Sequence, residues 1–196
     1  MEKPTLENIL NFVGLLNKFR EVKRVILVKD SDRDENDQEH SYSLAMLAWY
    51  VNSTYKLGLD NEKLFKYALA HDLVEIHAGD TFFYHQNEEV VKDKTERELE
   101  AATKLDEEFP EFLDMHEAIF NYENKTDREA KFVYALDKVE PVLNIYLDGG
   151  RTWKRDEVTI EMLKSMKTPK VAADPIVAEI FAELVQKLES KKEELF

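Results

Sequence analysis

Apolar residues recur at spacings of three and four along nearly the whole chain, and few residues interrupt the pattern. Only five glycines and five prolines occur among 196 residues. Spacings of three and four place side chains on one face of an α-helix, whereas a half-buried strand needs alternation. We therefore expect an all-α fold, a helical bundle. A chain of this length can bury a substantial core, and a single domain over residues 1–196 is expected.

Capping residues and helix breakers mark the expected helix boundaries. Thr5 and Asp174 are suitable N-caps, and Pro175 follows Asp174 at the first helical position. Gly79 is a C-terminal stop. Residues 22–39 are polar and charged after Leu27 and indicate a connection. The expected helices cover residues 5–20, 40–58, 60–79, 89–109, 110–125, 126–150 and 174–190.

The first expected helix has apolar residues along one side. These residues are Leu6, Ile9, Leu10, Val13 and Leu16. Such a stripe is typical of a helix that packs one face against other parts of the protein.

Composition excludes several classes of function. The net charge is −14, with 41 acidic and 27 basic residues, so the surface repels polynucleotides, which bind mainly through lysine and arginine. No cysteine is present, which excludes disulfides, thiolate metal ligands and cysteine nucleophiles. No apolar stretch approaches the ~20 residues of a membrane helix, and the N-terminus lacks a secretory pattern. We expect a cytoplasmic protein with neither a membrane nor a nucleic acid polymer as a partner.

The stretch "ALAHDLVEIHAGD", residues 68–80, concentrates ionisable groups within an apolar helix. His71 and Asp72 are neighbours, and Glu75 follows one turn later. A histidine nitrogen beside a carboxylate oxygen is a mixed set of ligands suited to a divalent metal. Glu75 would overhang that metal without binding it.

Two side chains cannot hold a catalytic metal alone, so further ligands must come from other helices. His40 begins the preceding expected helix, and Asp137 lies between apolar neighbours in "FVYALDKVEP". Buried aspartates are rare unless they are paired or bound to a metal. His40, His71, Asp72 and Asp137 would form a set of two histidines and two aspartates that leaves positions open to water, which is typical of a catalytic site.

Three segments, "QEHSYSLAMLAWYV", "ALAHDLVEIHAGD" and "ALDKVEP", carry these residues in the order H…HD…D. This order resembles the signature of HD-domain metal-dependent phosphohydrolases. The similarity extends to the 5′-deoxynucleotidase branch, which shares E-H-S, H-D-x-x-E-x-x-x-G-D and a late Asp-Lys-x-Glu. It covers roughly residues 15–150, and the C-terminal helices, expected to pack on that part, match only in character.

The resemblance implies an all-helical, dimeric enzyme that removes phosphate from deoxyribonucleoside 5′-monophosphates. It also implies a divalent transition metal such as cobalt or manganese, while the ligand types equally suit iron, nickel or zinc. By position, the metal ligands would be His40, His71, Asp72 and Asp137. The substrate would be a small-molecule nucleotide, and the expected assembly is a homodimer.

The resemblance also assigns roles around the metal. Glu75 would be the catalytic acid or base, and Asp80 a carboxylate that orients the substrate or supports the residues that touch it. Arg24, in "VKRVIL", occupies the place of the family's phosphate-binding arginine, and its fork geometry suits a phosphate. Val25 stands where some members carry a tryptophan. Independently of the resemblance, Lys138 directly follows Asp137 and would add a second positive charge.

Three other functions are compatible with the same residues. An HD phosphohydrolase could act on an alarmone or on a nucleoside triphosphate, although those branches carry longer chains or further motifs. A non-catalytic HD fold could sense a metal or a nucleotide, but such a sensor does not need the acid or base Glu75. A helical interaction protein would bind no stoichiometric metal.

Overall fold

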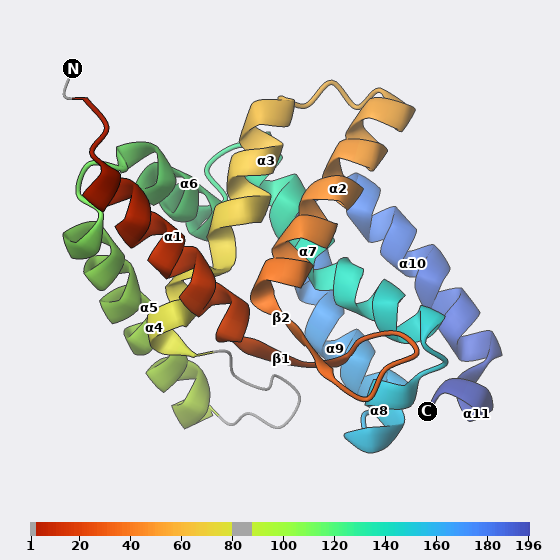
Figure 1. Cartoon of the computed structure of the whole chain (residues 1–196). Coiled ribbons are helices and arrows are strands. Elements are labelled where there is room, and N and C mark those ends of the chain that lie inside the picture. Colours follow the sequence, from red (N-terminus) through yellow and green to blue (C-terminus); the bar gives the residue numbers. More distant parts are fainter. Residues whose placement is uncertain (1–2, 80–87) are drawn as a thin grey trace.

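The computed structural model describes residues 3–79 and 88–196, and most of them are helical (Figure 1). The prediction of an all-α fold is confirmed. The helices are α1 (Leu6–Glu21), α2 (Asp37–Tyr55), α3 (Asn61–Ala70), η1 (His71–Val74, a 3₁₀ turn), α4 (Glu75–Ala78), α5 (Glu88–Glu108), α6 (Leu113–Asn124), α7 (Arg128–Leu147), α8 (Arg151–Arg155), α9 (Ile160–Val171), α10 (Pro175–Ser190) and α11 (Lys192–Leu195).

Helix α7 runs through the middle of the molecule (Figure 1). It contacts α2, α3 and α6, and also α9 and α10. Its side chains are buried on most sides, and the fully buried Phe132 and Val133 are among its core residues. A helix that is buried all round needs few charges, so an aspartate and a glutamate in its middle, Asp137 and Glu140, are conspicuous.

Residues 22–39 contain a small antiparallel hairpin, where the sequence predicted only a connection. Strand β1 (Lys23–Leu27) pairs with β2 (Asp34–Asn36). The hairpin is anchored on α8, because the backbone N–H of Leu27 donates to Oγ1 of Thr152 at 3.1 Å. The strands are short and β2 is charged, so no alternation of apolar residues marked them.

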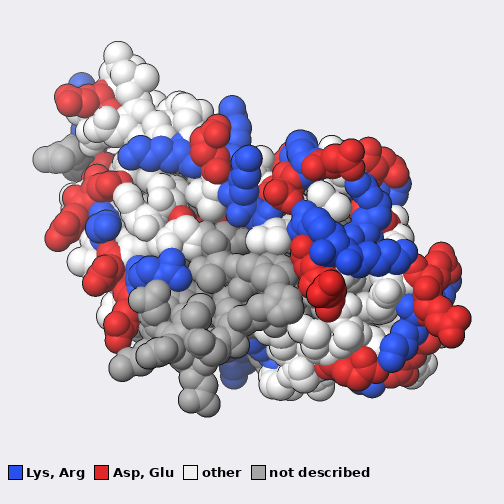
Figure 2. Space-filling view, turned by 90° about the horizontal axis from the view of Figure 1, so that it is seen from below, with Lys and Arg blue, Asp and Glu red and all other residues white. Residues whose placement is uncertain are grey.

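Basic side chains of α8 fasten the hairpin further. Arg155 forms an ion pair with Asp34 at 2.9 Å and donates to the carbonyl of Val25 at 3.2 Å. Arg151 pairs with Asp32 and donates to the carbonyl of Ser31. Figure 2 shows basic side chains gathered on this side of the molecule, with acidic side chains around them. The hairpin that carries Arg24 is therefore held against α8.

The single helix expected over residues 60–79 is divided into α3, η1 and α4. α3 ends at Ala70, and the four residues of η1 separate it from α4. Over four residues an apolar pattern cannot distinguish the 3.0 residues per turn of a 3₁₀ helix from the 3.6 of an α-helix. The continuous α-helix was therefore a wrong prediction, and the break lies at His71 and Asp72.

Most predicted helix ends agree with the structure. Thr5 caps α1, and Asp174 caps α10 with Pro175 at its first position. Helix α2 begins earlier than expected, at Asp37, through a capping box formed by Asn36 and Glu39. Within the described ranges, no helix is long and apolar enough to cross a bilayer. The single domain over residues 1–196 stays a prediction.

Candidate metal centre and active site

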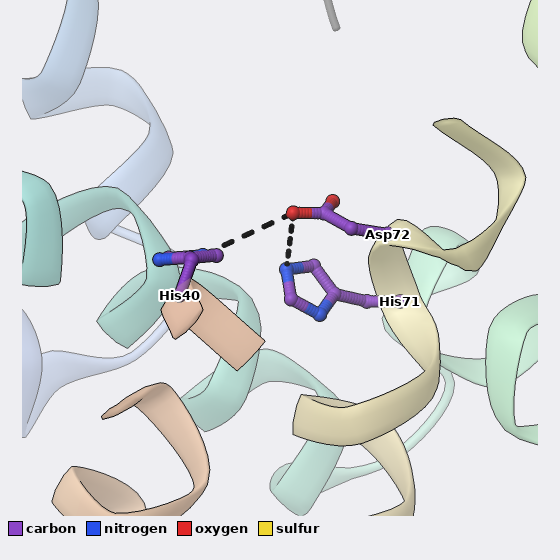
Figure 3. A group of neighbouring side chains, drawn as sticks. All are labelled: His40, His71 and Asp72. Carbon is purple, nitrogen blue, oxygen red and sulfur yellow. Dashed lines mark ion pairs between the residues drawn. The ribbon is translucent and has the colours of Figure 1, made fainter. Parts of the chain in front are cut away.

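The four predicted metal ligands lie close together, on three separate elements. His40 is in the first turn of α2, His71 and Asp72 are in η1, and Asp137 is in the middle of α7. Both histidines and Asp137 are buried. The Asp72 carboxylate points between the two imidazole rings (Figure 3), with Oδ2 at 3.1 Å from Nε2 of His71 and 4.0 Å from Nε2 of His40.

Asp137 completes this cluster from the side of α7. Its Oδ1 lies 3.0 Å from Nε2 of His40 and 3.8 Å from Nε2 of His71. The two Nε2 atoms, Oδ2 of Asp72 and Oδ1 of Asp137 thus face one another. The structure brings all four predicted residues together, and their assignment as ligands stays a prediction.

The second ring nitrogen of each histidine is held by another group. Nδ1 of His71 lies 3.0 Å from the carbonyl oxygen of Ala68, to which it can only donate. Nδ1 of His40 lies 3.1 Å from Oε2 of Glu140. Protons on these two Nδ1 atoms leave both Nε2 lone pairs directed at the cluster, which is the usual tautomer of a metal-bound histidine.

The donor set fits a cation. If Nδ1 of His71 carries the proton, its Nε2 lone pair faces the Asp72 and Asp137 carboxylates. Lone pairs facing one another repel, so a proton or a metal ion must lie between them. His40, His71 and Asp72 also offer ligand atoms that all lie within 4.8 Å of one another. Two imidazoles and two carboxylates suit a divalent transition metal.

The carboxylates favour positive charge on the histidines. Burial and Arg24 lower the pKa of His40, but hydrogen bonds with Asp137 and Glu140 outweigh them and raise it to about 9. Burial lowers the pKa of His71, and the charge of Asp72 and the hydrogen bond with Asp137 raise it to about 10. Metal binding displaces such protons, so the site that attracts them also attracts a cation.

The pKa values of both aspartates are lowered below the ordinary value. Burial raises the pKa of Asp72, but the charge of His71 and the nearby Arg24 lower it below its ordinary value. Asp137 behaves likewise, with Lys138 as the largest opposing influence. Its Oδ2 accepts a hydrogen bond from the hydroxyl of Tyr122 at 2.6 Å and pairs with Lys138.

Arg24 reaches the cluster from strand β1. Its Nη1 lies 2.9 Å from Oδ2 of Asp72 and 3.1 Å from Oδ1 of Asp37, and its Nε lies 3.6 Å from Oε2 of Glu35. The side chain is only 15% exposed. Arg24 is therefore largely buried, and its guanidinium lies beside Asp72, a predicted metal ligand. Phosphate binding by Arg24 stays a prediction.

Two lysines interact with Asp137. Lys138 pairs with Asp137 and lies over the ring of Tyr134, 5.0 Å from its centroid. Lys167, from α9, interacts electrostatically with Asp137 and Lys138, and burial together with Lys138 lowers its pKa to about 7. Cationic side chains are therefore gathered locally in a strongly acidic protein. Substrate binding by Lys138 stays a prediction.

Of the two carboxylates predicted to act on the substrate, only Glu75 falls within the described residues. Glu75 is the first residue of α4, buried, and three residues beyond Asp72. In a 3₁₀ turn residues i and i+3 are eclipsed, so Glu75 follows Asp72 on the same side of η1. Asp80 lies outside the described residues.

Sequence reasoning missed several residues of this site. Glu140 was visible only as the last residue of the Asp-Lys-x-Glu motif, although it shares a helix face with Asp137 at i+3. Asp37 is fully buried, yet it stands in an acidic run, "DSDRDENDQE", that looks like surface. Glu35 is also buried, and burial together with Glu140 raises its pKa to about 7. Tyr122 had no signal, since its partner is distant in sequence.

Comparison with known proteins identifies the class. The sequence profile of the HD domain family matches residues 16–178, and the chain belongs to this family. The HD-domain resemblance seen in the sequence is therefore confirmed.

Particular relatives carry more specific names. The 5′-deoxynucleotidase HDDC2 of Bos taurus is 30% identical over 139 residues, covering 69% of this chain and 65% of the relative. Its Homo sapiens counterpart is 29% identical, with 69% and 66% covered. The chain thus spans about two thirds of the length of these relatives. A crystal structure of a predicted metal-dependent phosphohydrolase from Magnetospirillum magnetotacticum MS-1 superposes with a TM-score of 0.79 at 30% identity, covering 95% of this chain and 96% of that one.

Proposed function

We propose that this protein is a metal-dependent phosphomonoesterase that hydrolyses deoxyribonucleoside 5′-monophosphates to deoxynucleoside and phosphate. The observation that carries the proposal is the convergence of His40, His71, Asp72 and Asp137 from three elements, with the guanidinium of Arg24 beside Asp72. The similarity to proteins named 5′-deoxynucleotidase supports the substrate class.

In this proposal His40, His71, Asp72 and Asp137 hold a divalent cation, with cobalt or manganese the first choices. When bound, the cation supplies Lewis acidity and positive charge for the phosphate. His40, His71 and Asp137 would keep it in place, because the outer atoms of these three residues are held by Glu140, Ala68 and Tyr122.

The remaining steps belong to side chains of the chain itself. Arg24 attracts the phosphate by its positive charge, and Lys138 adds a second positive charge. Water attacks phosphorus as the bond to the 5′-oxygen breaks. Glu75 takes a proton from that water, and the departing 5′-oxygen gains one from the same carboxyl group. Asp80 would orient the sugar.

The reaction is tested by phosphate release from a panel of deoxyribo- and ribonucleoside 5′-monophosphates, with cobalt or manganese and with chelator. We expect release that needs metal and favours deoxynucleotides. Glu75→Gln should slow it roughly 10²–10⁴-fold, whereas Glu62→Gln, an exposed glutamate on α3, should have no effect.

Absence of release from every monophosphate, despite bound metal, would overturn the proposal. Release from a nucleoside triphosphate or an alarmone would then assign another branch of the family. Binding of deoxynucleotide without turnover of any substrate would assign a sensor.

We also propose that the protein forms a homodimer through α1 and α2, which contact each other. The apolar side of α1 predicted to pack is instead largely exposed, with Leu6 at 72% and Ile9 at 51%. On α2, Tyr42 is 64% and Trp49 is 46% exposed. Contiguous exposed apolar surface marks interaction sites, and large obligate interfaces are apolar.

Light scattering on the purified chain tests this assembly. The wild type is expected to have the mass of two chains, and the double variant Ile9→Glu/Trp49→Glu the mass of one, because buried charges without partners are costly. Leu99→Glu, at an exposed leucine of α5, should leave the mass unchanged. A monomeric wild type would refute the homodimer.

A further inference from the structure

Glu140 is a buried carboxylate that the proposed reaction does not use. It is 3% exposed, and its Oε2 lies 3.1 Å from Nδ1 of His40, which is itself fully buried. The other ring nitrogen, Nε2, lies 3.0 Å from Oδ1 of Asp137. Both nitrogens of His40 therefore face carboxylates, one inside the predicted ligand set and one outside it.

The second oxygen of Glu140 is also held. Nδ2 of Asn144 donates to Oε1 of Glu140 at 2.7 Å. Asp137, Glu140 and Asn144 are spaced at i, i+3 and i+7 on α7, so they follow one another along a single face of the helix. This face meets the first turn of α2, where the capping box of Asn36 and Glu39 sets the start of the helix.

The burial of Glu140 indicates that its two contacts are needed. A carboxylate removed from water is costly unless it is paired and hydrogen-bonded, and Glu140 has one partner for each oxygen. Histidine offers two nitrogens, and only the nitrogen without a proton can ligate a metal. A carboxylate beside Nδ1 holds the proton there and leaves the lone pair on Nε2.

We propose that Glu140, oriented by Asn144, is the positioning residue that makes His40 a metal ligand through Nε2. The carboxylate accepts the Nδ1–H of His40, fixes the ring orientation, and raises the basicity of Nε2 by its negative charge. This inference rests on the metal site of the proposed function and is independent of the substrate.

A purely structural role predicts something different. If Glu140 only neutralises a protonated His40, its loss lowers the stability of the fold and does not weaken the affinity for metal. If Glu140 positions His40, the affinity for metal falls even where the protein remains folded. Metal affinity therefore separates the two roles.

The test is isothermal titration of Co²⁺ into the full chain, stripped of metal beforehand, together with the visible absorption of the cobalt form. Glu140→Ala removes both the acceptor and the charge, and is expected to weaken the Kd for Co²⁺ by roughly 10–100-fold. Glu140→Gln keeps an acceptor oxygen without the charge, and Asn144→Ala leaves the carboxylate in place but less oriented. Both should weaken binding less than Glu140→Ala, and the cobalt spectrum should change in the same order.

Asp148→Asn is the matched control, since Asp148 is another buried carboxylate at the end of α7, paired with Arg151 and the backbone of Asp30. It should lower the melting temperature and leave the Kd unchanged. Unchanged Kd values in the Glu140 variants, with a lowered melting temperature, would overturn the proposal. If Glu140→Ala does not fold, Glu140→Gln and Asn144→Ala decide by the same criterion.

Phosphate release plays no part in this measurement. A wild type that binds Co²⁺ but hydrolyses no nucleotide would refute the proposed function and leave the role of Glu140 to be decided by the Kd values. A wild type that binds no Co²⁺ would overturn both.

Discussion

His40, His71 and Asp137 each have an outer partner that directs the remaining atom toward the cluster. The carbonyl of Ala68 holds His71, and Tyr122 holds Oδ2 of Asp137. Buried ionisable groups need such partners, because an unsatisfied one costs about 1–3 kcal/mol. The partners also restrict rotamers, so the atoms that face the cluster are positioned before any ligand arrives.

Tyr122→Phe tests this positioning at a single hydrogen bond. The variant removes the donor to Oδ2 of Asp137 and leaves a buried carboxylate oxygen with Lys138 alone. We expect the free energy of unfolding, measured in urea with chelator present, to fall by about 1.5 kcal/mol.

Tyr134→Phe is the control for that measurement. The ring of Tyr134 packs 5.8 Å from that of Tyr122, but among the described residues its hydroxyl makes no hydrogen bond. If the free energy of unfolding falls equally in both variants, the hydrogen bond from Tyr122 to Asp137 does not stabilise the fold.

At the scale of elements, helix ends and the break at η1 place the functional residues. The capping box of α2 fixes the turn that carries His40. The 3₁₀ turn η1, which lies between α3 and α4, carries His71 and Asp72, and these two side chains face His40 of α2 and Asp137 of α7. The Asp127 carboxylate helps to join the N-terminus of α7 to α3. Asp127 accepts from the backbone N–H of Ala130, from Lys63 and from Tyr67, each at 2.8 Å.

Asp127 makes this junction sensitive to pH. Burial raises its pKa, but Lys63, the N–H of Ala130 and Tyr67 outweigh burial and lower it below 3.8. A group with a lowered folded pKa stabilises the protein above its unfolded pKa, and this contribution disappears as pH falls through the folded pKa. Asp127→Asn keeps a good cap and loses the charge.

We therefore expect Asp127→Asn to lower the free energy of unfolding by about 1 kcal/mol at pH 7, and by progressively less below pH 4. Urea titrations of both proteins at pH 7 and pH 3 measure the difference. A difference of the same size at both pH values would contradict the role of the ionised carboxylate.

At the scale of the whole molecule, the predicted ligands join parts of the chain that are far apart in sequence. Residues of α2, η1 and α7 meet at one point, and α7 contacts the helices on both sides of it. A ligand that binds only this folded arrangement stabilises the entire fold.

Addition of Co²⁺ or Mn²⁺ should consequently stabilise the protein against unfolding. At a free concentration of 100 times the Kd, the expected gain is about 2.7 kcal/mol, or roughly 5–10 °C in the melting temperature of a chain of this size. His40→Ala should melt at the same temperature with and without metal. A wild type whose melting temperature does not respond to metal or chelator would contradict a resident metal site.

The sequence by itself determined the helical class and the residues H…HD…D, because both are carried by local spacing and residue type. It also located caps at Thr5 and Asp174, where a side chain bonds its own neighbours. The expectation of a long helix over residues 60–79 failed because a 3₁₀ turn and an α-helix share a pattern over four residues.

Only the tertiary structure decided which polar residues are buried together. Glu140 reaches His40 across 100 positions, and Tyr122 reaches Asp137 across a helix–helix contact. Arg24 is brought to Asp72 by a hairpin that α8 holds in place. Such contacts depend on how helices pack against one another, and packing joins residues that no local period connects. The exposed apolar side of α1 has the same origin, because its pattern predicts a packed face and cannot say which surface covers it.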